Sequence, residues 1–245
     1  MKLYGLIGYP LGHSFSKIFF TDKFECESID AKYELFEIQS IDNFLELVKN
    51  HTLSGLNVTI PYKEQVIPFL DELDETAAQI GAVNVIKFIR KDNSLTLKGY
   101  NSDVIGFSKS ISKHLQPYHK KALILGTGGA SKAIDYGLRK LGIETTFVSR
   151  NPNNKQLLYS DLDSDVLSEN LIVVNTTPVG MFPNENECPD VPYNFLTPKH
   201  LLFDLVYNPA ETLFLKKGKE KGTITLNGLE MLELQAVSAW EIWNK

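Results

Sequence analysis

Near its middle the chain carries an apolar run that passes directly into glycines. Leu123 to Ala130 read L-I-L-G-T-G-G-A, and a helical pattern follows over 130–141. A strand, a glycine turn and a helix in this order begin a βαβ unit, whose crossover helix returns the chain to a parallel strand. The run therefore predicts a doubly wound, Rossmann-like α/β unit in this half of the chain.

Short apolar runs alternate with helical patterns along nearly the whole chain, which favours α/β architecture with mostly parallel strands. We expect strands over residues 2–8, 32–38, 55–59, 121–125, 144–148, 171–175 and 201–206. We expect helices over residues 14–24, 41–49, 63–70, 72–80, 104–112, 130–141 and about 229–243. A hairpin is predicted from 83–89 to 96–99 across K-D-N-S, and Lys216 to Gly222 reads as a lysine-rich surface turn. Because the pattern becomes plain βαβ after Asp103, we expect a domain boundary there.

Composition narrows the classes of function. The chain has 245 residues, and its 43% hydrophobic and 22% charged content is ordinary for a globular protein with one large or two small domains. A net charge of −5 without a basic run disfavours nucleic acid as a partner. The apolar start ends at Pro10, too early for a signal peptide, and no run is long enough to span a membrane. Cys26 and Cys188 have neither metal nor redox spacing, so we expect reduced thiols, no metal and a cytoplasmic location.

The glycine turn also predicts a nucleotide site. Gly126 permits the tight turn, and Gly128 lets backbone N–H groups approach a pyrophosphate at the start of the following helix. The next strand ends in V-S-R-N, with Ser149 and Arg150 where an NAD-specific fold usually has an acidic residue. An arginine there can pair with a 2′-phosphate, which favours NADP; alternatively, Arg150 is an ordinary surface charge.

Polar residues gather at predicted strand ends in the first half of the chain. Asn57 and Thr59 alternate on one strand, and Lys63 follows the turn at Pro61 in N-V-T-I-P-Y-K. Asn84 ends G-A-V-N, and N-S-D spans residues 101–103. So many polar groups in places that a buried strand would keep apolar suggest a site for a small polyhydroxylated acid.

The segment H-S-F-S, His13 to Ser16, adds two hydroxyls at a predicted helix start. Ser14 and Ser16 can face one carboxylate, although serines at helix starts are more often N-caps. For His13 we favour a structural role. A lysine and an aspartate, Lys63 and Asp103, near a hydride-carrying cofactor suit alcohol–ketone interconversion, in which hydride and proton move together.

Together these motifs resemble the shikimate dehydrogenase family. The resemblance covers nearly the whole chain in order: P-L-G-H-S-F-S, N-V-T-I-P-Y-K, G-A-V-N, G-Y-N-S-D-V-I-G, G-T-G-G-A, N-T-T-P-V-G-M, D-L-V-Y-N-P and N-G-L-E-M-L-E-L-Q-A. It implies NADPH-dependent, reversible reduction of 3-dehydroshikimate to shikimate, a step toward chorismate and the aromatic amino acids. It also implies a substrate domain over 1–103, completed by 229–245, and a Rossmann-like NADP domain over 104–228.

The resemblance assigns roles residue by residue. Lys63 and Asp103 would form the catalytic pair. The substrate would contact Ser14, Ser16, Asn57, Thr59, Lys63, Asn84, Ser102, Asp103 and Gln235. The cofactor would contact Gly126, Gly128, Gly129, Ala130, Ser149, Arg150, Thr176, Thr177, Met181, Val206, Tyr207, Gly228 and Met231. The expected partner is the small-molecule substrate alone, with the protein a monomer or a homodimer.

Some positions depart from the family pattern. Ser102 replaces the usual threonine and Lys17 an expected proline, and N-P-N-N-K after Arg150 leaves only Arg150 and Lys155 for a 2′-phosphate. Ser16 is the residue type of shikimate enzymes rather than of quinate-using relatives. Two alternatives remain: a quinate or shikimate dehydrogenase that uses NAD, and a non-catalytic NADP or metabolite sensor.

Overall fold

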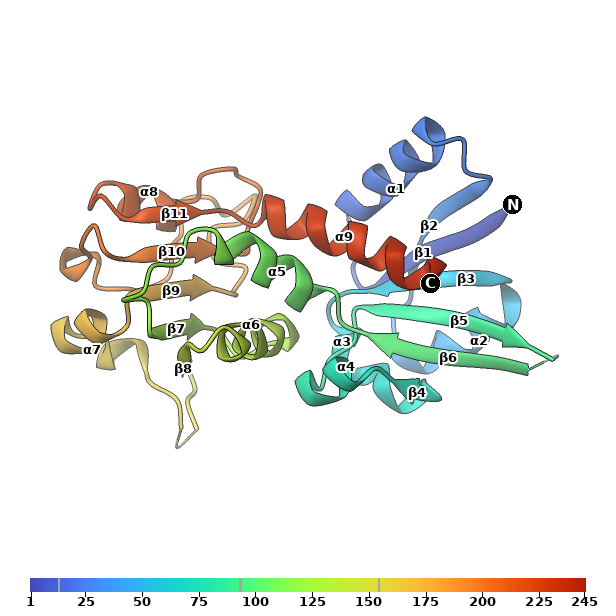
Figure 1. The fold of residues 1–245 in the computed structure, drawn as a ribbon, viewed down its shortest axis with the longest axis horizontal. Helices are drawn as coiled ribbons and strands as arrows, with labels where there is room; N and C mark the ends of the chain where they lie inside the picture. Colours follow the sequence, from blue (N-terminus) through green and yellow to red (C-terminus); the bar gives the residue numbers. More distant parts are fainter. Residues whose placement is uncertain (13, 93, 154) are drawn as a thin grey trace. The chain divides into compact units, whose positions relative to one another are not determined.

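The protein, seen here in a computed structural model, is described over residues 1–12, 14–92, 94–153 and 155–245 (Figure 1). His13, for which the sequence favoured a structural role, lies outside the described residues. Contacts divide the chain into two compact units: unit 1 comprises Met1–Ser102 and Gln235–Lys245, and unit 2 comprises Asp103–Leu234. No helix in the described ranges combines the length and apolar character that crossing a bilayer requires.

Unit 1 is built on a mixed sheet of six strands in the order β2-β1-β3-β5-β6-β4. The strands are β1 (Lys2–Gly8), β2 (Ala31–Glu37), β3 (Leu53–Val58), β4 (Glu72–Leu73), β5 (Val85–Lys91) and β6 (Ser94–Tyr100). β1 runs parallel to β2 and β3, whereas β5 runs antiparallel to β3 and β6. Asn57 consequently pairs with Val85, and Val85 with Tyr100. This register brings the end of β3, the residue before β5 and the residues after β6 together, at the end of the sheet where β3 and β6 finish.

Helical segments cover both faces of this sheet. They are α1 (Phe15–Cys26), η1 (Ile41–Asn43), α2 (Phe44–Asn50), α3 (Tyr62–Gln65), η2 (Ile67–Phe69) and α4 (Glu75–Ile80), with the end of α9 (Leu229–Asn244). One apolar cluster joins Phe20 of α1 to Trp243 of α9, and the other centres on Phe44 of α2. Trp243 also donates from Nε1 to the carbonyl oxygen of Ile86 at 3.1 Å. A side chain at Gly55 would meet the Trp243 ring, so the glycine permits this close approach.

Two predicted helices of unit 1 are partly wrong. The segment over 72–80 begins as strand β4, because Glu72 and Leu73 pair with β6, and its helix starts only after Asp74. Asp74 caps that helix by accepting from the backbone N–H of Thr76 at 3.0 Å. The predicted helix over 63–70 is broken into α3 and the 3₁₀ turn η2, which contains Pro68.

Unit 2 contains a five-stranded sheet, entirely parallel, in the order β11-β10-β9-β7-β8. Its strands are β7 (Lys121–Leu125), β8 (Glu144–Val148), β9 (Ile172–Asn175), β10 (Leu201–Asp204) and β11 (Ile224–Leu226). Its helical segments are α5 (Asp103–Ser112), α6 (Gly129–Lys140), η3 (Tyr159–Asp161), α7 (Ser164–Glu169), η4 (Tyr193–Phe195), α8 (Leu213–Lys219) and the start of α9. The strand order reverses between β7 and β9, and doubly wound folds bind their ligands at such a reversal, beyond the carboxyl ends of the strands.

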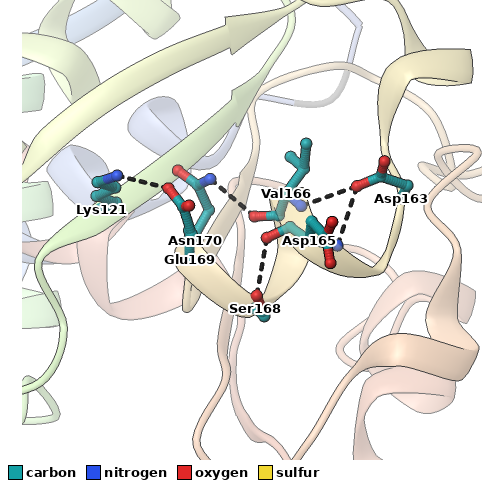
Figure 2. Close-up of polar contacts among 7 residues, drawn as sticks. All are labelled: Lys121, Asp163, Asp165, Val166, Ser168, Glu169 and Asn170. Atoms are coloured by element: carbon teal, nitrogen blue, oxygen red, sulfur yellow. Dashed lines mark hydrogen bonds and ion pairs between the residues drawn. The ribbon is translucent and has the colours of Figure 1, made fainter.

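Helix α7 was not predicted, although its polar contacts are local and well defined (Figure 2). Asp163 accepts from the backbone N–H groups of Asp165 and Val166 at 3.0 and 2.9 Å, which caps the helix. At the other end, Glu169 forms an ion pair with Lys121 at the start of β7, 2.6 Å apart. The expected lysine-rich turn is also corrected, because Lys216 and Lys219 lie in α8, which Thr212 caps.

Candidate active site

In unit 1, a network of hydrogen-bonded, buried polar side chains lies where strands β3 and β6 end. Asn57 Nδ2 donates to the carbonyl oxygen of Asn84 at 3.3 Å. Asn84 in turn donates from Nδ2 to Ser102 Oγ at 3.0 Å, and its Oδ1 accepts from the Ser102 N–H at 2.7 Å. Ser102 Oγ donates to Gln235 Oε1 at 3.4 Å. These four residues are each less than 8% exposed, so the network is preorganised rather than loosely solvated.

Tyr33 of β2 extends this hydrogen-bond network. The sequence analysis did not identify Tyr33 as a site residue. Its hydroxyl donates to Asn57 Oδ1 at 2.7 Å, and its side chain is also hydrogen-bonded to Ser16. Burial raises the pKa of Tyr33 above its usual range, and the contact with Ser16 offsets part of that effect. The phenol therefore stays protonated and acts as a donor. The only signal in the sequence is a hydroxyl between Ala31 and Leu35 on the apolar face of an alternating strand, which is weak.

The backbone of Lys63 is hydrogen-bonded next to this polar network. Its carbonyl oxygen accepts from the N–H of Val83 at 2.7 Å, next to Asn84, and its side chain is half-buried on α3. Thr59, just beyond β3, is also half-buried and packs closely on Gly8, where a Cβ would meet its methyl group. Ser14 caps α1 by accepting from the N–H of Lys17 at 3.4 Å. Asp103, directly after Ser102, is buried and opens α5 of unit 2.

In unit 2, the glycine turn connects β7 to α6 as a cradle open to a ligand. Gly126 has φ of +104°, a conformation that disfavours a side chain, and a Cβ there would meet Thr176 and Thr177 at 2.9 Å. A Cβ at Gly128 would lie in open space. Gly128 is the N-cap of α6. Because glycine has no side chain, it cannot cap the first N–H groups of the helix. Gly129 and Ala130 begin the helix, so their backbone N–H groups belong to its positive end.

The loop after β9 lies against this turn. Thr176 donates from both its N–H and its Oγ1 to the carbonyl oxygen of Leu125, at 3.0 and 2.6 Å. Thr177 donates from its N–H and Oγ1 to Asn175 Oδ1, at 3.1 and 2.6 Å. Asn175 Nδ2 donates to Asp204 Oδ1 at 3.0 Å, an oxygen that also accepts from the Val206 N–H. Asn175 and Asp204 are fully buried and support two expected cofactor loops, a role that the sequence did not reveal.

The remaining expected cofactor residues fall into three groups. Ser149 and Arg150 directly follow β8, with Ser149 Oγ accepting from the N–H of Asn151 at 3.2 Å and Arg150 exposed. Met181 is 46% exposed, and Tyr207 is half-buried after β10. The third group is buried: Val206, Gly228 and Met231. Gly228 donates to the Val206 carbonyl at 3.1 Å and leaves no room for a Cβ beside Leu205, whereas Met231 packs in the apolar core.

The structure thus gathers Ser16, Asn57, Asn84, Ser102 and Gln235 into one network in unit 1. In unit 2 it gathers the glycine turn with Thr176 and Thr177 at the point where the strand order reverses. The first set offers amide and hydroxyl groups for a polar ligand, and the second offers backbone N–H groups for a phosphate.

Comparisons with known proteins agree on one family. Residues 6–86 match the family described as shikimate dehydrogenase substrate binding domain. The shikimate dehydrogenase (NADP(+)) of Methanosphaera stadtmanae is 38% identical, covering 98% of this chain and 90% of that protein. A chorismate mutase/shikimate 5-dehydrogenase fusion protein from Clostridium acetobutylicum superposes with a TM-score of 0.87 at 38% identity, covering 99% of this chain and 91% of the other. Shikimate 5-dehydrogenase from Thermus thermophilus, solved with NADP(H) and shikimate, gives 0.86 at 28% identity, covering 99% and 93%.

Proposed function

The chain belongs to the shikimate dehydrogenase family, and we propose that it catalyses the reversible NADPH-dependent reduction of 3-dehydroshikimate to shikimate. The reaction is a step in the biosynthesis of chorismate and the aromatic amino acids. The observation that carries the proposal is the match over nearly the full length to a shikimate dehydrogenase (NADP(+)). Both units contribute polar groups suited to the reaction.

The residues of unit 2 fit NADP(H). The open cradle at Gly128 and the start of the twelve-residue helix α6 suit the pyrophosphate. Arg150 lies just after β8 in V-S-R-N, a segment with no carboxylate, and suits the 2′-phosphate. Thr176, Thr177, Met181, Val206, Tyr207, Gly228 and Met231 complete the proposed contacts. When bound, the nicotinamide supplies the hydride.

Unit 1 supplies the proposed substrate site. Ser14 and Ser16 would hold the carboxylate, and Asn57, Thr59, Asn84, Ser102 and Gln235 would contact the ring hydroxyls. The hydrogen bonds through Tyr33 and Ser102 support this assignment, because they fix the side-chain orientations before substrate arrives. We accordingly propose that unit 1 is the substrate-binding domain and unit 2 the NADP-binding domain.

Lys63 and Asp103 would carry the proton of the reacting oxygen. In the direction of reduction, a proton must reach the carbonyl oxygen as hydride reaches the carbon, and a lysine ammonium can both stabilise the developing negative charge and donate. Asp103, which is buried and directly follows Ser102, would act with Lys63 in this transfer.

The test is to follow absorbance at 340 nm with shikimate or quinate, each combined with NADP or NAD. Turnover confined largely to shikimate with NADP supports the proposal. Turnover that favours quinate or NAD would overturn the specificity, and cofactor binding without turnover would favour a sensor. Purified Lys63→Ala protein serves as the control, because its loss of activity ties the signal to this chain rather than to a contaminating dehydrogenase.

The cell compartment and partners follow from the same assignment. We place the protein in the cytoplasm, where its NADP(H) and substrate would be found and where Cys26 and Cys188, which form no disulfide, would stay reduced. The partner at the active site is the small-molecule substrate.

A further inference from the structure

The segment that carries Ser14 and Ser16 leads from the end of β1 into α1. Ser14 is the N-cap of α1 and has extended backbone angles, with φ of −101° and ψ of 116°. Its Oγ accepts from the N–H of Lys17 at 3.4 Å. That bond uses a lone pair of the hydroxyl oxygen and not its hydrogen, which can donate to a carboxylate. The direction of this hydrogen depends on how the chain enters the helix.

One face of β2 is turned toward this segment. Side chains alternate along a strand, so Tyr33 and Glu37 lie on the same face of β2. Tyr33 is hydrogen-bonded to Ser16, and it belongs to the apolar cluster against which Leu11 packs. Glu37 is the last residue of β2 and pairs with Gly8, the last residue of β1. The side chain of Glu37 therefore lies beside the start of the segment.

Glu37 holds the segment through a hydrogen bond across 26 positions of the chain. The N–H of Leu11 donates to Glu37 Oε2 at 2.9 Å. A carboxylate acceptor makes such a bond stronger than a neutral oxygen would. The segment is also held before Leu11, where the N–H of Tyr9 donates to the carbonyl oxygen of Ile60 at 3.1 Å. Of these two bonds, the one to Glu37 lies nearer to Ser14 and has the greater influence on where the chain enters α1.

We infer that Glu37 is a positioning residue for the carboxylate of the substrate and acts through Leu11 on Ser14 and Ser16. The inference rests on the proposed function, because it needs a carboxylate at these two serines. Leu11 lies three residues before Ser14, and Ser16, which Tyr33 holds, lies two residues after it. The two contacts with β2 therefore bracket Ser14. Without the bond from Glu37, the serine hydroxyls would have to be ordered as the carboxylate binds, which weakens binding.

The charge of Glu37 has an effect of the opposite sign on binding. A carboxylate near an anion site repels the ligand, so removal of the charge alone should strengthen binding, whereas removal of the acceptor should weaken it. Glu37→Gln removes the charge and keeps a side-chain oxygen that can accept from Leu11. Glu37→Ala removes both. Because Glu37 is exposed, neither substitution leaves a cavity in the core.

Isothermal titration calorimetry with shikimate, in the absence of cofactor, tests the inference by binding alone. Glu37→Ala should raise the dissociation constant of shikimate about tenfold, as expected for the loss of one charge-assisted hydrogen bond. Glu37→Gln should keep it within about threefold of the wild type, because the acceptor remains. The control Glu34→Ala should leave it unchanged, since Glu34 lies on the opposite face of β2 and pairs with Lys32. In steady-state kinetics, kcat and the KM for NADP should change by less than about twofold in all three variants.

The neutral methyl ester of shikimate shows whether Glu37 acts on the carboxylate. For the ester, Glu37→Ala should raise the dissociation constant by no more than about twofold, because the group that Glu37 serves is absent. A merely structural role would weaken both ligands equally, and far-UV circular dichroism shows whether each variant is folded.

Three results overturn the inference: an unchanged affinity of Glu37→Ala for shikimate, equal weakening of both ligands, or a Glu37→Gln protein that binds as poorly as Glu37→Ala. A wild type that binds shikimate without turnover overturns the proposed function alone. A wild type that does not bind shikimate overturns both.

Discussion

Asp204 allows a direct test of how burial and hydrogen bonding compete in unit 2. Its carboxylate is fully buried at the end of β10. It accepts from Asn175 Nδ2 and the Val206 N–H, each at 3.0 Å, and from Thr212 Oγ1 at 2.6 Å. Burial raises the pKa of Asp204 from 3.8 to about 6, because the three donors do not fully offset the loss of hydration.

The perturbation is Asp204→Asn. The amide oxygen can keep the bonds from Asn175 and Val206, and the new N–H₂ group can donate to Thr212. In the wild type the folded state holds the Asp204 proton more tightly than the unfolded state does. The free energy of unfolding that Asp204 contributes therefore falls as pH rises from about 4 to about 6, and is constant above that. A pKa difference of about 2 corresponds to about 3 kcal/mol.

The assay is urea unfolding of both proteins at several pH values between about 4 and 7, which spans the two pKa values. Far-UV circular dichroism follows both units, whereas the fluorescence of Trp240 and Trp243 follows unit 1. The free energy of unfolding of the wild type minus that of Asp204→Asn should fall by about 3 kcal/mol across this range. The same difference taken with Asp190→Asn, at an exposed aspartate, should stay flat. A difference for Asp204 that is flat or rises with pH would refute the reasoning, because the donors would then outweigh burial.

Three further predictions concern the proposed reaction. Lys63→Ala should lower kcat by at least about a hundredfold while the KM for shikimate changes little, and steady-state kinetics in which only KM rises would make Lys63 a binding residue. Tyr33→Phe removes the donor to Asn57 and should raise the KM for shikimate about tenfold, with urea unfolding showing a loss of about 1 to 3 kcal/mol; an unchanged KM would mean that Asn57 is held without it. Arg150→Ala should raise the KM for NADP about tenfold and leave that for NAD unchanged, and equal effects on both would contradict a 2′-phosphate contact.

The parallel strands of unit 2 show what the sequence could predict of the fold. The strands expected over 121–125 and 144–148 match β7 and β8, because both are short runs rich in apolar and β-branched residues between clear turns. The expected strand over 2–8 matches β1 for the same reason. β4 and α8 were not predicted as such. β4 is two residues long and exists through its pairing with β6, a tertiary contact that no local pattern encodes.

Helix α7 was also not predicted, although the sequence contains a signal for its start. Asp163 precedes S-D-V-L-S-E, and an aspartate directly before the first turn of a short amphipathic segment is a typical N-cap. At six residues the helix is too short for its periodicity to stand out. Short helices are therefore better recognised by their caps than by their apolar faces.

In the candidate site too, the sequence predicts the local features but not the contacts between residues that are distant in the chain. Sequence spacing indicates which polar residues end a strand, and so Asn57, Asn84 and Ser102 could be named before the structure was known. It does not indicate which polar groups satisfy one another inside the protein, because those contacts join strands far apart in the chain. Tyr33 reaches Asn57 across 24 residues, and Asp204 reaches Asn175 across 29. Tyr33 lies outside the recognisable motifs, whereas Asn175 and Asp204 each begin one, and all three buried side chains fix the orientation of neighbouring site residues. Substitutions there should change substrate or cofactor affinity without touching a ligand, which is the outcome that the Tyr33→Phe experiment measures.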